Sequence, residues 1–251
     1  MEVRSVCLIS NLAMISTSYN LNSQILRLQS MQKWFVVKHF INRNWEVLLL
    51  CFVCALLVFS GHLLASAKVS TPYPLLNNSI SLFAYLRQFF APIGVVSTIG
   101  VVIFNFLPLP PRRRRLLIDL TFALIMLRIL LVFGILNLMI FLPPSDRVLL
   151  FSQLLLFLPC LLLFWGWIYW RVDTHSVAIG KGRIFTSSTS KDEIPPAYDY
   201  FIASFTSLLT NTPANFNGTT RYARTLIFLH GVMMWDIMGL TLSRAIALAS
   251  A

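Results

Sequence analysis

A short polar stretch near the C-terminus carries the residues whose chemistry is most distinctive. Thr210, Asn211, Thr212 and Asn215 lie close together between two apolar segments. Hydroxyl and amide oxygens of this kind replace the hydration shell of an ion or a polar solute in the filters of membrane channels. The pattern therefore makes residues 204–216 a candidate permeation loop.

Two charged residues stand inside apolar segments, where a charge is costly. Arg128 is near the middle of the apolar run 116–142, and Asp236 is near the middle of the run 225–249. A charge at the centre of a bilayer costs at least about 2.5 to 3.5 kcal/mol on the insertion scale, so such residues usually face the protein interior and pair. We predict a buried ion pair between Arg128 and Asp236, which is either a structural bridge between two helices or a charge relay.

The sequence contains no pattern typical of catalysis or of a bound metal. Its 4 histidines and 9 acidic residues are scattered, and no H-E-x-x-H motif occurs. Cys51 and Cys54 lie inside an apolar run, where a C-x-x-C pair is most simply two small apolar side chains. We therefore expect no enzymatic activity, no cofactor and no metal.

The composition indicates an integral membrane protein. Hydrophobic residues make up 57% of the 251 residues and charged residues only 12%, whereas charged residues supply about 25% of a soluble domain. The net charge of +11 comes mostly from residues between the apolar runs. Basic residues in such loops set the topology of a membrane protein, so we expect the lipid bilayer as partner and no nucleic acid.

Five apolar runs reach the length of about 20 residues that a transmembrane helix needs. A shorter segment, 198–210, predicts a half-length helix, and Pro92 and Gly94 predict a bend or an interruption in the second run. We predict an all-α membrane protein with about five transmembrane helices, plus a re-entrant half-helix and loop before the last one, and we expect no β structure. The five runs are 45–66, 82–107, 116–142, 148–170 and 225–249.

These runs divide the chain into three parts. Residues 1–44 are a polar and basic segment that we expect to be partly disordered, with Met31 as a second candidate start of the natural chain. Residues 45–142 hold three transmembrane helices and an arginine-rich loop. Residues 148–251 form a unit of outer helix, connector, re-entrant loop and inner helix.

The C-terminal unit resembles the pore domain of two-helix potassium channels. Asp199 and aromatic residues precede Ser204-Phe205-Thr206-Ser207-Leu208, and Thr210 and a loop then lead to an apolar helix that begins with arginines. The filter departs from that family, because Thr212-Pro213-Ala214 replaces Gly-Tyr-Gly and Asn215 replaces the usual aspartate. Filter carbonyls need the backbone freedom of glycine, whereas proline fixes φ. The resemblance therefore implies a pore-like hairpin without potassium selectivity.

Residues 112–250 look more similar to uncharacterised bacterial integral membrane proteins that have such a hairpin and a degenerate filter. The run Trp167-Ile168-Tyr169-Trp170-Arg171-Val172-Asp173 at the end of the outer helix carries this resemblance. It implies a multi-pass protein of a bacterial inner or plasma membrane.

The distribution of Lys and Arg predicts a cytoplasmic N-terminus. In that orientation Arg112, Arg113, Arg114 and Arg115 form a cytoplasmic loop that meets anionic lipid headgroups. The pore-like loop then also faces the cytoplasm, opposite to its side in potassium channels. The alternative is that one apolar run, such as the one containing Pro92, does not cross the membrane.

Two functional hypotheses follow. In the first, the protein has an unknown specific function and a non-selective or non-conducting hairpin, in which Thr206, Ser207 and Thr210 are helix-packing hydroxyls. In the second, a homo-oligomer forms an ion channel or a transporter that uses residues 204–216 as its permeation path.

Overall fold

The computed structural model describes residues 44–65, 73–107, 110–141, 147–187, 195–210, 213, 216–242 and 246. The chain divides into two compact units, Met1–Leu48 and Leu49–Ala251. The predictions made for residues 1–43 lie outside the described residues. The account below concerns the second unit.

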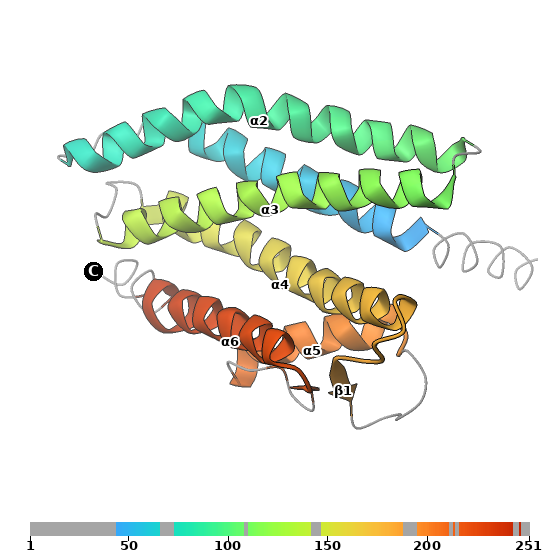
Figure 1. The fold of residues 1–251 in the computed structure, drawn as a ribbon. Helices are drawn as coiled ribbons and strands as arrows, with labels where there is room; N and C mark the ends of the chain where they lie inside the picture. Colours follow the sequence, from blue (N-terminus) through green and yellow to red (C-terminus); the bar gives the residue numbers. More distant parts are fainter. Residues whose placement is uncertain are drawn as a thin grey trace, which may run out of the picture. The chain divides into compact units, whose positions relative to one another are not determined.

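Helices dominate the described chain (Figure 1). A first helix, Asn44–Ala65, is followed by α2 (Pro74–Phe106), α3 (Pro111–Phe141), α4 (Arg147–Ala178), α5 (Ala197–Thr210) and α6 (Arg221–Trp235). A π-helical segment, η1 (Asp236–Leu242), continues α6 directly. The predicted half-length helix at 198–210 is confirmed as α5.

Four helices are long and apolar enough to cross a membrane, as an integral membrane protein requires. They match the first four predicted spans. The fifth predicted span, 225–249, extends past Leu242 into residues outside the described part of the chain. The four segments are Asn44–Ala65, Asn77–Phe106, Pro111–Met139 and Phe151–Ala178.

Helix α2 continues through Pro92 and Gly94, so the predicted interruption is wrong, whereas the predicted bend stays a prediction. A proline inside a helix removes one backbone hydrogen bond and favours a kink, but neighbouring turns can hold the helix together. Here the hydroxyl of Thr98 donates to the carbonyl of Gly94 over 2.7 Å, and that of Ser97 donates to the same carbonyl over 3.1 Å.

Helix α3 corrects a second prediction, because the four arginines 112–115 form its first turn and not a loop. Pro111 occupies the first position, where a missing N–H costs nothing. The carbonyl of Pro110 accepts from the amides of Arg113 and Arg114 over 3.0 and 3.2 Å. Arginine is also a good helix former, so the four arginines add to the N-terminal end of α3, which is its polar end.

Helix α4 extends eight residues past its predicted end at 170, to Ala178. It ends in a Schellman motif: the amide of Gly180 donates to Val177, and that of Lys181 donates to Ser176. Gly180 adopts φ +75°, as this motif requires. The aromatic run 167–173 therefore lies on a helix, where its side chains point in defined directions.

Two short strands also differ from the all-α prediction. Strand β1 (Phe185–Ser187) pairs antiparallel with β2 (Phe216–Gly218), and Phe185 lies opposite Gly218. Strands of three residues are too short to show a period of two in the sequence. The pair brings together the two ends of the segment that contains α5.

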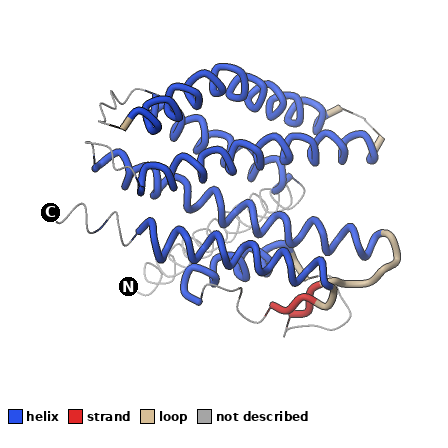
Figure 2. Tube along the Cα trace, turned by 60° about the vertical axis from the view of Figure 1, so that its left-hand side comes forward, coloured by secondary structure: helices blue, strands red, loops and turns tan. Residues whose placement is uncertain are grey.

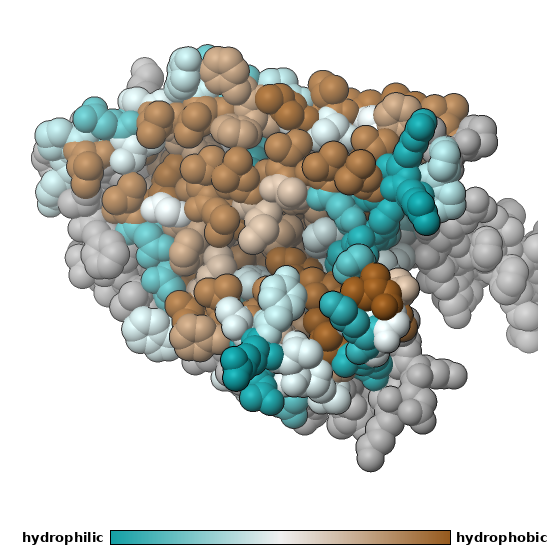
Figure 3. Space-filling view, viewed as in Figure 1, coloured by the Kyte–Doolittle hydropathy of each residue, from teal (hydrophilic) through white to brown (hydrophobic). Residues whose placement is uncertain are grey.

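Helix α4 is the central element, since 61% of its apolar window is buried, the largest share among the four spans. Helix α5 packs along it, α6 contacts it through His230 and Tyr169, and the β1–β2 pair lies at its C-terminal end (Figures 1 and 2). The face formed by α2 and α3 is mainly hydrophobic, and hydrophilic residues gather where α3 begins and α4 ends (Figure 3). This distribution suits a helix bundle whose ends reach a polar phase.

Candidate functional site

Residues 197–218, which we call the hairpin, are the candidate site. The hairpin begins with α5 and returns to β2, whose partner β1 follows α4 closely. Along α5, Tyr200 contacts Asp173 of α4, and the hydroxyl of Ser204 donates to the carbonyl of Leu162 over 2.7 Å. The hairpin thus extends along α4 from the C-terminal end of that helix and then returns to the same end.

Asp173 anchors the start of the hairpin. Its carboxylate is fully buried, and it accepts hydrogen bonds from the Tyr200 hydroxyl, from the amides of Ile184 (2.7 Å) and Phe185 (3.3 Å) and from Nε of Arg183 (3.3 Å). A buried carboxylate is stable only when it is paired and hydrogen-bonded. Asp173 therefore joins α4, the residues before β1, and α5 at one point.

His230 of α6 holds the middle of the hairpin. Its Nδ1 atom lies 2.8 Å from the hydroxyl of Tyr169, and its Nε2 atom lies 3.1 Å from that of Ser207. The imidazole is fully buried and stacks on Trp165 with ring centroids 4.8 Å apart. A neutral imidazole has one donor and one acceptor nitrogen, and a hydroxyl can serve either. His230 consequently connects α4, α5 and α6 with both nitrogens satisfied.

The hydroxyl groups of α5 bond to carbonyls of the same chain. Thr206 donates to Ala203 over 2.8 Å, Ser207 to Ser204 over 2.5 Å, and Thr210 to Thr206 over 3.1 Å. Ser204 and Ser207 are fully buried. These hydroxyls already have protein partners without any second subunit.

Close packing fixes the separation of α5 and α4. A Cβ atom added at Gly166 would lie 3.0 Å from the Cα of Phe201 and closer still to its ring. Gly166 thus lets the two helix backbones approach at the point where α5 crosses α4.

Aromatic rings seal the end of the hairpin near the strands. Phe185 of β1 stacks on Phe216 of β2 with centroids 4.6 Å apart, and Tyr169 and Tyr200 contact the edges of this pair. The strand pairing places these two phenylalanines together, and their rings pack against the rings of both tyrosines.

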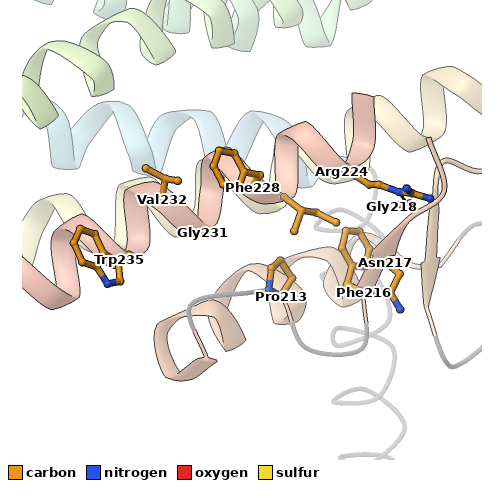
Figure 4. Close-up of a pocket in the computed structure, with 10 residues that line it drawn as sticks. Pro213, Phe216, Asn217, Gly218, Arg224, Phe228, Gly231, Val232 and Trp235 are labelled. Atoms are coloured by element: carbon orange, nitrogen blue, oxygen red, sulfur yellow. Dashed lines mark hydrogen bonds between the residues drawn. The ribbon is translucent and has the colours of Figure 1, made fainter. Parts of the chain in front are cut away.

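A groove of about 670 Å³ lies between the returning chain and α6. Pro213 and Phe216 approach it from the hairpin, and Phe228, Val232 and Trp235 line it from α6 (Figure 4). Trp235 and Phe228 are largely exposed. The groove is apolar except at the end where Asn217 and Arg224 lie.

The structure places one of the four predicted loop residues. Thr210 is the last residue of α5 and is exposed. Asn211, Thr212 and Asn215 lie outside the described residues, and their role in permeation stays a prediction.

Arg128 and Asp236 each contact a different residue. Nη2 of Arg128, which is buried, donates to the carbonyl of Leu57 over 2.5 Å, and Oδ2 of Asp236 accepts from Nδ2 of Asn137 over 3.0 Å. Asn137 is nine residues beyond Arg128 on α3, about 13 Å along a helix that rises about 1.5 Å per residue. These two contacts do not bring the residues together, and their pairing stays a prediction.

Sequence reasoning did not assign partners to the residues that hold the hairpin. Tyr169 and Asp173 lie in the aromatic run 167–173, but Tyr200 and His230 come from segments further along the chain. The sequence around a single buried histidine does not indicate which hydroxyls form hydrogen bonds with it. Only the helix packing reveals the cluster.

No three His, Cys, Asp or Glu side chains in the described residues gather closely enough to hold a metal ion.

Comparison with family models, with curated proteins and with solved structures finds no match. The fold and the site therefore define the class: a helical protein with four helices able to cross a membrane and a short helical hairpin packed against the most buried of them.

Proposed function

We propose that this chain is a multi-pass integral membrane protein whose hairpin is a re-entrant structural element, closed within one subunit and not itself an ion-conducting path. The observation that carries the proposal is the hydrogen bonding of α5. Its hydroxyls donate to carbonyls of the same chain, and Ser207 also contacts His230. A hydroxyl that donates its proton to a carbonyl of its own subunit acts as a helix-packing group, and the serine and threonine hydroxyls of α5 all do so within one subunit.

The length of α5 supports the re-entrant placement. Its 14 residues span about 21 Å at about 1.5 Å per residue, less than the hydrocarbon core of about 30 Å. Irregular backbone at membrane depth is tolerated only where protein or water covers it. Helices α4 and α6 supply such a cover on one side of the hairpin.

The basic residues support an orientation. The first turn of α3, the end of α4 and the start of α6 lie at the same end of the second unit, as the contacts of Arg115 and Arg171 with Asp119 and of Arg224 with Gly218 show. Basic residues favour the cytoplasmic side. We propose that this end and the N-terminus face the cytoplasm, in a bacterial inner or plasma membrane.

A second candidate function rests on a different observation. Helices α5 and α6 expose large apolar side chains, with Leu209 88% and Phe228 68% exposed. In a homo-oligomer these surfaces would meet other subunits around an axis, and the loop 204–216 would line a shared channel or transport path.

Reconstitution in liposomes distinguishes the two. We expect no flux of monovalent ions at any applied potential and no detergent-resistant tetramer. The Asn211→Leu and Asn215→Leu variants should leave this result unchanged. A flux in the wild-type protein that either variant abolishes, without loss of folded protein, would establish the oligomeric channel or transporter instead.

A further inference from the structure

A second groove, on a different face from the hairpin, has the character of a binding site. It lies among α3, α4 and α6 and has a volume of about 620 Å³. Its floor is aromatic: Phe122 and Trp167 stack with ring centroids 3.7 Å apart and planes 7° apart, and Phe164 lies beside them. All three rings are buried, so the groove has a rigid apolar floor.

One end of this groove is polar and positively charged. Arg171 makes two hydrogen bonds with Asp119, over 2.8 and 2.6 Å, and Arg115 approaches the same carboxylate within 3.4 Å. Two guanidinium groups thus share one carboxylate, which leaves a net positive charge. The exposed side chains of His175 and Tyr222 complete this end of the groove.

More positive charge surrounds the same end. The exposed arginines at the first turn of α3 lie one to two turns from Asp119 on the same helix, and Arg115 also stacks over Trp170 at 5.3 Å. In the direction away from this end, the groove is lined by apolar residues as far as Met126 and Phe164. The 11 positions from Phe164 to His175 on α4 correspond to about 16 Å, so the charge and the apolar floor form one continuous amphipathic surface.

We propose that this groove binds an anionic phospholipid, with the phosphate at the Arg171 end and an acyl chain along the Phe122 and Trp167 floor. Charge complementarity identifies the occupant, because a neutral lipid or an apolar helix would leave the basic end unmatched. Anionic lipids are attracted to basic residues at the cytoplasmic surface of a membrane. The proposal rests on the membrane location given above, but it does not depend on whether the hairpin conducts.

Tryptophan quenching tests the proposal in the full-length protein, reconstituted in vesicles of phosphatidylcholine. The probes are phosphatidylglycerol and phosphatidylcholine, each with the same brominated acyl chain, because bromine quenches a tryptophan that it touches. We expect the brominated phosphatidylglycerol to quench with an apparent affinity about fivefold higher than the brominated phosphatidylcholine, as one basic contact would give. The Trp167→Phe variant should lose most of this difference, which assigns it to the groove.

Two matched pairs of variants locate the lipid. Ala123→Phe fills the groove, whereas Leu120→Phe adds a ring on the exposed part of α3 outside it. His175→Glu adds a negative charge at the polar end, whereas Ile179→Glu adds it one turn further on, outside the lining. We expect the first member of each pair to reduce the preference for phosphatidylglycerol at least threefold and the second to leave it within twofold of wild type.

Three results would overturn the proposal. The first is equal quenching by the two lipids in the wild-type protein. The second is a preference that survives His175→Glu, a substitution at an exposed position, since the phosphate would then bind elsewhere. The third is a combination of two observations: both lipids quench the wild-type protein only weakly, and Ala123→Phe changes the oligomeric mass. This combination would assign the groove to a second copy of the chain. None of these results bears on ion flux, so failure here and failure of the proposed function are separable.

Discussion

The imidazole of His230 lies 2.8 Å from the hydroxyl of Tyr169, so α6 is tied to α4 through two fully buried side chains. This contact joins residues 61 positions apart in the sequence. Ser207 contacts the other nitrogen of the same ring, so the hairpin is joined to both α4 and α6.

This arrangement predicts the effect of removing the histidine. His230→Phe keeps a ring that can stack on Trp165, but it leaves the Tyr169 hydroxyl without the nitrogen that it contacts. A buried polar group without a partner costs about 1 to 3 kcal/mol, and we expect this loss in the free energy of unfolding measured in mixed detergent micelles. The double variant with Tyr169→Phe should lose less than the sum of the single variants. His62→Phe, at an exposed position of the first helix, is the control and should change stability by less than about 0.5 kcal/mol.

The Asp173 anchor predicts a larger loss. Asp173→Asn removes the charge that pairs with Arg183 and replaces one acceptor oxygen with a donor facing Tyr200. Breaking a buried ion pair costs about 3 to 5 kcal/mol, whereas Tyr200→Phe should cost about 1.5 to 3 kcal/mol, as for a hydrogen bond to a charged group.

Asp199→Asn is the matched control for Asp173. Asp199 is only half buried, in the first turn of α5, where its charge favours the helix N-terminus by less than about 1 kcal/mol. If Asp173→Asn proved no more destabilising than Asp199→Asn, the anchoring role of Asp173 would be wrong.

Replacing glycine with alanine should affect thermal stability differently at two positions in long helices, Gly166 and Gly134. Gly166→Ala places a methyl group against Phe201 of α5, whereas Gly134→Ala meets open space. Overpacking costs about 1 to 3 kcal/mol, and alanine in a helix gains up to about 1 kcal/mol over glycine. We expect Gly166→Ala to lower the thermal midpoint and to increase proteolysis within the hairpin, and Gly134→Ala to do neither. Equal midpoints for the two variants would contradict the close packing of α4 and α5.

The elements that the sequence predicted well are those with strong local signals. Long apolar runs located the first four helices, and the short segment before the polar loop located α5. The helix ends were less accurate, because Arg112–Arg115 are helix formers that continue α3, and because the stop signal of α4 is Gly180 and not the charged residues before it. The pairing of β1 with β2 and the partners of His230 depend on contacts between distant segments, which no local pattern encodes.

The last prediction concerns Arg128 and Asp236, which the sequence predicts to form a buried ion pair. Asp236→Ala and Arg128→Leu should each be strongly destabilising, and the double variant should recover much of the loss. In the structure Arg128 also contacts the carbonyl of Leu57, and Asp236 contacts Asn137. We expect Asn137→Ala to couple with Asp236→Ala, because that pair shares a hydrogen bond. In a double-mutant cycle we expect a coupling energy between Arg128 and Asp236 above about 1 kcal/mol. Losses that add within about 0.5 kcal/mol would show that these two residues do not interact.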